Sequence, residues 1–133
     1  MLGEQIAEGL GQRTARRVVA TAPKLQIEVS FEDRTTLLGL EGFNIGTYVS
    51  STRPDGTLEG EGQGVFAAPG GEMATWRGVA NGRLHADGAV SYRGALTYSS
   101  ASPALGRLNA VAGVFEFEVT AKGETRSKIW EWK

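Results

Sequence analysis

Few residues of this chain have the types and spacing that catalysis or metal binding requires. The sequence contains a single histidine, His85, and no cysteine. A serine–histidine–aspartate triad would have to use His85, yet no G-x-S-x-G segment accompanies it. One histidine cannot build a histidine-rich metal site, and without cysteine there is no thiolate ligand or nucleophile. We therefore interpret His85 as a turn residue and expect neither a metal nor a cofactor.

The segment "GEGQG" at residues 60–64 has the glycine content of a phosphate-binding loop. Neither a helical pattern nor a lysine follows it, so it fits neither the P-loop nor the dinucleotide fingerprint. Glycine at alternate positions is typical of a strand, where successive side chains point to opposite faces. We expect these glycines to face inward and Glu59, Glu61 and Gln63 to face solvent. Their spacing does not fit a calcium loop.

The remaining candidates are residues that strand alternation would place on one inner face. They are Tyr48, Trp76, Tyr92, Tyr98, Phe115, Phe117 and Glu131. Such a face is either a packed core or the lining of a pocket in which phenol hydroxyls orient a ligand. Glu131 is either at a solvated rim or a candidate for ligand orientation or acid–base work. The sequence leaves both alternatives open.

Hairpin turns must position these residues. Segments 54–56 (Pro-Asp-Gly), 86–88 (Ala-Asp-Gly) and 121–123 (Ala-Lys-Gly) each fit a three-residue loop that ends in a glycine of positive φ. The segment at 69–71 (Pro-Gly-Gly) fits the same rule. A fifth candidate loop, Glu32-Asp33-Arg34, lacks glycine and would set Val29 opposite Leu37.

These turns predict the strand registers. The expected cross-strand pairs are Tyr48 with Gly62, Gly64 with Trp76, Phe66 with Ala74, Gly82 with Tyr92, Trp76 with Tyr98, and Glu116 with Lys128. Several large inner residues then face small ones, and the opposite face is mostly polar. An alternative two-residue Lys122-Gly123 turn would set Phe115 opposite Trp130 and send Glu131 outward.

The predicted fold is all-β, a closed antiparallel up-and-down barrel of about eight strands, because closure removes the exposed edges of consecutive hairpins. A β-sandwich is the alternative. Ser102-Pro103 predicts one short helical turn. Residues 1–133 form a single domain, in which residues 1–11 are either a less ordered or an edge segment. Strands are expected at 13–20, 24–31, 35–40, 43–52, 57–67, 73–84, 89–99, 111–120 and 126–132.

Composition narrows the classes of function. Apolar residues make up 41% and charged residues 22% of 133 residues, with a formal net charge of −1. That balance disfavours a nucleic-acid partner, which usually requires a basic surplus. No apolar stretch is long enough to span a bilayer, and no secretory signal is visible, so we expect no membrane partner and a cytoplasmic location. The lack of cysteine fits a reducing compartment.

Several segments resemble a group of small bacterial proteins. They are "GTYVSSTRPDGTLEGEGQGVF", "GEMATWRG", "VSYRGALTYSS", "GRLNAVAGVFEFEV" and "KIWEWK". That group is similar in fold to the allene oxide cyclase barrel, which is a calycin-like closed β-barrel. The resemblance implies a barrel with an apolar cavity from about residue 13 onward. It does not imply the cyclase reaction, because none of the catalytic positions of the plant cyclases can be matched to this chain.

Three functions are compatible with these observations. The first is binding of a small apolar or amphipathic ligand inside the barrel. The second is a structural or oligomeric module without ligand. The predicted register places Trp130 and Trp132 on the outer face, where either the N-terminal segment or a second chain in a homodimer would cover them. The third is an isomerase or cyclase-like enzyme that uses a buried carboxylate of raised pKa. We rank them in that order.

Overall fold

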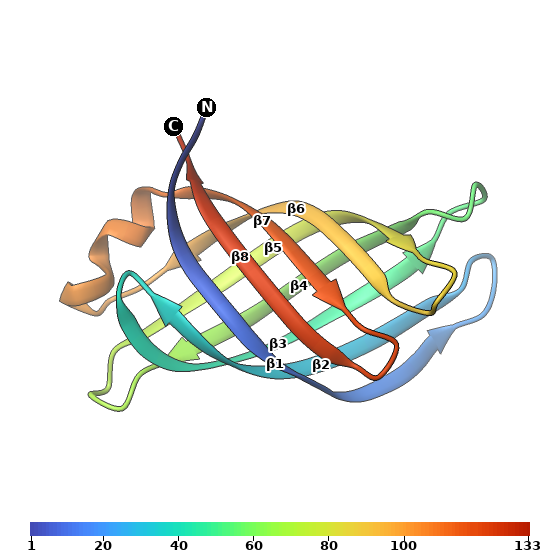
Figure 1. Ribbon diagram of the computed structural model, residues 1–133, viewed down its shortest axis with the longest axis horizontal. Coiled ribbons are helices and arrows are strands. Elements are labelled where there is room, and N and C mark those ends of the chain that lie inside the picture. Colours follow the sequence, from blue (N-terminus) through green and yellow to red (C-terminus); the bar gives the residue numbers. More distant parts are fainter.

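The chain forms a closed antiparallel barrel of eight strands in the computed structural model, which describes all of residues 1–133 (Figure 1). Each strand pairs with its neighbours in sequence, and β8 pairs with β1 to close the barrel. The elements are β1 (Leu2–Ala20), β2 (Gln26–Leu37), β3 (Leu40–Thr52), β4 (Leu58–Ala67), β5 (Met73–Leu84), β6 (Val90–Ser99), the 3₁₀ helix η1 (Pro103–Ala110), β7 (Ala112–Val119) and β8 (Glu124–Trp132). The predicted up-and-down barrel is confirmed.

The glycine-terminated turns set the registers as predicted. Gly56, Gly71, Gly88 and Gly123 have φ angles of 87°, 96°, 91° and 89°, which side chains with a Cβ rarely adopt. All six pairs expected from the glycine-terminated turns are observed, from Tyr48 with Gly62 to Glu116 with Lys128. The alternative two-residue turn is excluded by the observed β7–β8 register.

The predicted loop at Glu32-Asp33-Arg34 is wrong. Strand β2 runs through these residues without a break, so that Val29 pairs with Tyr48 and Leu37 with Leu40. The turn lies instead at Leu38-Gly39, whose φ angles are 49° and 79°. The physical reason is that this hairpin, like those at Gly56, Gly71, Gly88 and Gly123, turns at a glycine of positive φ, which residues 32–34 lack. Two of the expected strands, 24–31 and 35–40, are therefore largely one strand.

Residues 2–11, for which a less ordered or an edge segment was expected, form the first half of β1. They pair with β2 on one side and with β8 on the other. Glycines permit this close approach: a Cβ added to Gly11 would lie 2.0 Å from the carbonyl oxygen of Glu32. This segment is therefore an integral barrel strand.

The helix η1 closes one end of the barrel, near the two chain termini (Figure 1). Its Leu105 and Leu108 are fully buried in a cluster that includes Leu37 and Phe66. On its other side, Arg107 pairs with Glu131 of β8 at 2.7 Å and with Glu4 of β1 at 3.0 Å. Apolar burial and ion pairs thus hold η1 against the barrel. No helix in the protein is long and apolar enough to span a membrane.

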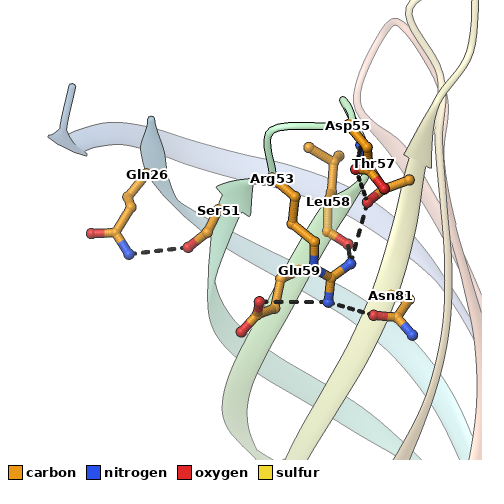
Figure 2. Close-up of polar contacts among 8 residues, drawn as sticks. All are labelled: Gln26, Ser51, Arg53, Asp55, Thr57, Leu58, Glu59 and Asn81. Atoms are coloured by element: carbon orange, nitrogen blue, oxygen red, sulfur yellow. Dashed lines mark hydrogen bonds and ion pairs between the residues drawn. The ribbon is translucent and has the colours of Figure 1, made fainter. Parts of the chain in front are cut away.

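The opposite end carries a polar network around the β3–β4 turn (Figure 2). The Arg53 guanidinium donates to Asn81 Oδ1 at 2.7 Å and to the Leu58 carbonyl oxygen at 3.2 Å. Within the turn, Asp55 accepts from the Thr57 hydroxyl and backbone N–H, and these bonds lower the pKa of Asp55. These contacts join β3, β4 and β5 at the rim.

Replacing Gly62 or Gly82 with valine should destabilise the barrel. A Cβ at Gly82 would lie 2.6 Å from the Tyr92 ring, and one at Gly62 would lie 2.9 Å from the Thr47 carbonyl oxygen. Overpacking of this kind costs about 1–3 kcal/mol of unfolding free energy, measurable by chemical denaturation. Gly106→Ala is the control, because nothing lies within 4 Å of its added Cβ. Valine variants that melt like the parent would contradict the inner-face assignment.

Candidate functional site

Aromatic rings from four strands fill the half of the barrel away from η1. Phe31 and Phe117 lie 4.9 Å apart between ring centroids, and Tyr48 packs edge-on against Tyr92 at 5.5 Å. Trp76 of β5 extends the group, with its ring 6.4 Å from Phe31. These contacts join β2, β3, β6 and β7 through their inner faces, because every second residue of a strand points inward.

A small cavity of about 90 Å³ lies between this aromatic group and the residues under η1. Six of the seven predicted site residues line it, namely Tyr48, Trp76, Tyr92, Tyr98, Phe115 and Phe117. Drug-sized ligands occupy pockets of roughly 300–1,000 Å³, so this space suits a much smaller molecule. The interior is therefore mostly packed core with one small cavity.

A chain of hydrogen bonds that the sequence analysis did not find borders the cavity. The Trp76 indole N–H donates to Asn44 Oδ1 at 2.7 Å, and the Asn44 amide donates to Asp33 Oδ2 at 3.3 Å. The Thr35 hydroxyl donates to Asp33 Oδ1. Because the indole can only donate, its bond fixes which way the Asn44 amide faces. Every donor in this series of hydrogen bonds is oriented toward Asp33.

Glycine at position 9 makes room for this arrangement. Gly9 lies between Thr35 of β2 and Ser127 of β8 in the sheet. A Cβ added to Gly9 would lie 2.7 Å from Thr35 Oγ1, 2.8 Å from Ser127 Oγ and 3.1 Å from Asp33 Oδ1. Three side-chain oxygens thus converge on a position that only glycine leaves open. We call Asp33, Thr35, Asn44 and Ser127 the Asp33 cluster; all but Asp33 itself border the cavity.

Asp33 is 5% exposed, and burial raises the pKa of its carboxyl group, while the bonds from Thr35 and Asn44 offset this in part. Burial, and secondarily the Asp33 carboxylate, raises the pKa of Tyr98. Both effects have the same origin, because a charged group in an apolar interior loses its hydration. The site therefore holds an acid with neutral hydrogen-bond partners only.

The predicted carboxylate, Glu131, lies elsewhere. Its register is the expected inward one, opposite Gly113, but its side chain accepts a hydrogen bond from Arg107 at 2.7 Å and does not border the cavity. The geometry makes Glu131 an anchor for η1. His85 is also placed as expected, at the surface beside its turn, where its Nε2 lies 2.7 Å from Ser91 Oγ.

Asp33 was missed because the sequence analysis placed it in a turn. The sequence pattern that could have identified it is the alternation through β2. In a continuous strand, the side chains of Phe31, Asp33, Thr35 and Leu37 point to the same face. Phe31 and Leu37 at the two ends of this run are 4% and 1% exposed, so the polar residues between them also point inward. A strand continued through residues 32–34 would have indicated a buried carboxylate.

Three solved bacterial structures share this fold. A protein of unknown function from Clostridium acetobutylicum ATCC 824 is 11% identical, with a TM-score of 0.83 and 98% of each chain covered. A conserved protein of unknown function from Rhodopseudomonas palustris is 11% identical, with a TM-score of 0.80 and 99% of each chain covered. A β-barrel-like protein from Acinetobacter baumannii AYE is 11% identical, with a TM-score of 0.84, covering 100% of this chain and 96% of its own.

At this identity the likeness shows the fold alone. The barrel agrees with the resemblance to the allene oxide cyclase fold, but none of the three descriptions connects the chain to that activity. The sequence matches no protein-family model and no curated protein. Evidence for function must therefore come from the interior of this barrel.

Replacing Asp33 with asparagine should change how stability depends on pH. Because the folded pKa of Asp33 is raised, the folded state binds more protons than the unfolded state, and wild-type stability falls as pH rises through that range. Asparagine does not ionise, so the difference in unfolding free energy between variant and wild type should shift in favour of the variant as pH rises through that range. Below the ordinary aspartate range this difference should stay constant, as measured by urea denaturation at several pH values.

Asp55→Asn is a control for which the opposite change of stability with pH is expected. The pKa of Asp55 is lowered by its Thr57 bonds, so its stabilisation is present above the ordinary aspartate range and is lost as pH falls. That variant should lose stability relative to wild type as pH rises. A pH-independent difference for Asp33→Asn would contradict the assignment of Asp33 as a desolvated acid.

Proposed function

We propose that this protein binds a small, predominantly apolar molecule inside the barrel. The observation that carries the proposal is the cavity of about 90 Å³, lined mainly by aromatic and aliphatic side chains with a polar cluster on one side. Sites for small molecules typically combine an apolar lining with a few polar groups that fix orientation. A molecule with one polar end would satisfy both parts of this lining.

Access would be through the η1 end. At the opposite end, the rings of Phe31, Tyr48, Tyr92 and Phe117 contact one another and close the interior. The helix η1, in contrast, is a separate eight-residue segment whose inner contacts are made by Leu105 and Leu108. Displacing it would break no strand pairing, so we expect it to act as the movable cover.

An isomerase or another proton-transfer enzyme is the second candidate. The observation that favours it is Asp33, which supplies the inward carboxylate of raised pKa that such an enzyme needs. Asp33 is hydrogen-bonded to the cavity-lining residues Thr35 and Asn44, and Tyr98, which also lines the cavity, has a raised pKa that keeps its phenol a neutral hydrogen-bond donor. Binding ranks first because the cavity supports it without requiring any reaction.

Association into a homodimer is an independent proposal about the outer face. Val79, Ala95, Val114 and Trp130 follow one another across β5, β6, β7 and β8 in adjacent registers. Val79 is 58% exposed, and Trp132 at the end of β8 is 62% exposed. Contiguous exposed apolar surface of this kind often marks a protein contact. We call these five residues the outer apolar stripe.

Filling the cavity should abolish binding without harming the fold. Ala80→Leu places a larger side chain in the lining, away from the Asp33 cluster. We expect the wild type to bind a four-carbon alcohol or amine, detected as a shift of the Trp76 indole N–H signal in ¹⁵N NMR, and the variant not to bind. Its loss of unfolding free energy should not exceed the roughly 1–3 kcal/mol of an overpacked core. Ala95→Leu on the outer face is the matched control, and equal binding by both variants would contradict the proposal.

The homodimer predicts concentration-dependent self-association by light scattering. Val79→Lys should shift the protein toward monomer, because a charge in the outer apolar stripe would be desolvated in a contact. Leu84→Lys is the control, since Leu84 is equally exposed, at 63%, but lies outside the stripe. A wild-type protein that is monomeric at high concentration, with Trp130 and Trp132 open to a fluorescence quencher, would refute the proposal.

A further inference from the structure

The interior of the barrel has a negative group without a positive partner. The cavity lining contains no lysine, arginine or histidine. The acid behind its polar wall, Asp33, accepts hydrogen bonds only from the neutral side chains of Thr35 and Asn44, which line the cavity. Glu61, the one charged residue on the lining, is also acidic and belongs to the outward parity of β4. A buried charge without a partner is costly, so a positive charge would be stabilised here.

The direction of the hydrogen bonds also indicates a site for a positively charged group. Trp76, Asn44 and Thr35 all donate toward Asp33, which leaves oxygen lone pairs of Thr35 and Ser127 at the cavity. In the next row of the sheet, Thr125 is opposite Gly11, which in turn is opposite Asp33. Thr125 is 5% exposed, and its hydroxyl has no hydrogen-bond partner. The polar wall therefore offers acceptors for a group with several N–H donors.

Aromatic faces supply the remaining surface of the site. The rings of Phe31, Tyr48, Trp76, Tyr98 and Phe117 all border the cavity. The negative face of an aromatic ring attracts a cation, most strongly for tryptophan and where water is excluded. An anionic ligand such as a fatty-acid carboxylate would meet both these faces and Asp33 unfavourably.

We propose that the interior binds a small organic cation of the alkylammonium class, with Asp33 as its counter-ion. The inference rests on the interior binding proposed above and names the chemical class of its ligand. The ammonium group lies against the Asp33 cluster, where Thr35 and Ser127 oxygens accept its N–H donors. The alkyl part occupies the space between Trp76 and Phe115. Burial raises the pKa of Asp33 in the free protein, and the bound cation relieves that desolvation.

A matched series of ligands tests the charge preference on the wild-type protein. Butylammonium chloride, butan-1-ol and sodium butyrate share an alkyl chain and differ in charge. At pH 7 and constant ionic strength, each is titrated into ¹⁵N-labelled protein. The Trp76 indole N–H is the probe, and the outward Trp130 and Trp132 are internal controls. We expect butylammonium to bind about ten-fold more tightly than butan-1-ol and butyrate not to bind.

The outcomes separate this inference from the proposed function. Butan-1-ol binding as tightly as butylammonium, or butyrate binding best, overturns the cation assignment and leaves interior binding intact. Failure of all three ligands to shift the Trp76 signal overturns both. A shift confined to Trp130 and Trp132 also overturns both, because it reports binding at the outer surface.

Variants test the role of Asp33 directly. Asp33→Asn should lose the roughly ten-fold preference for butylammonium while keeping its affinity for butan-1-ol. Gly9→Ala is a second variant, because its methyl group would occupy the point where the Asp33, Thr35 and Ser127 oxygens converge. It should weaken butylammonium binding in the same way. Gly106→Ala is the control outside the site. If Asp33→Asn and Gly9→Ala both bind butylammonium as tightly as Gly106→Ala does, Asp33 is not the counter-ion.

Discussion

The structure depends on one steric constraint, the narrow interior of an eight-stranded barrel. Several large inward rings, those of Tyr48, Trp76 and Tyr92, lie opposite a glycine of a neighbouring strand. A Cβ at Gly64 would lie 2.4 Å from the Trp76 ring, and one at Gly94 would lie 2.1 Å from the Val79 carbonyl oxygen. The large-against-small pairing therefore fixes each register, since a shift by one residue would set rings against side chains. The solved relatives share this barrel at 11% identity, so a fold of this kind tolerates wide variation in sequence.

The same constraint explains where a site can exist. The rings of Phe31, Tyr48, Tyr92 and Phe117 fill one half, and Leu105 and Leu108 of η1 fill the other end. Between them the wall is made of small residues and of the Asp33 cluster, and this is where the cavity remains. Buried polar side chains are usually hydrogen-bonded, and Trp76, Asn44, Thr35 and Asp33 pair with one another at that level. A chain of hydrogen bonds that ends on one carboxylate is the result.

Much of this could be predicted from the sequence because turn chemistry and residue size agree. Glycine at the end of each three-residue turn gave the register, and the register placed Tyr48, Trp76, Tyr92 and Tyr98 on one face. The prediction failed where a turn was assigned without a glycine, at residues 32–34. Nor could the pairing of Glu131 be foreseen, because Arg107 lies in η1, and no strand register fixes where a connecting helix packs. Hydrogen bonds between side chains of distant strands, such as Trp76 with Asn44, likewise leave no local pattern.

The two inward carboxylates, Glu131 and Asp33, differ in their hydrogen-bond partners. This difference distinguishes a structural carboxylate from one that is available for a ligand. Glu131 accepts a hydrogen bond from Arg107 and holds the helix at the barrel end, so its charge is compensated within the protein. Asp33 is more deeply buried and has neutral partners only. Core positions between Phe31 and Leu37 would be more stable with an apolar residue of similar volume, since buried charge costs free energy even when hydrogen-bonded. A carboxylate that the fold does not need, hydrogen-bonded to residues that line an interior cavity, is best explained by what enters that cavity.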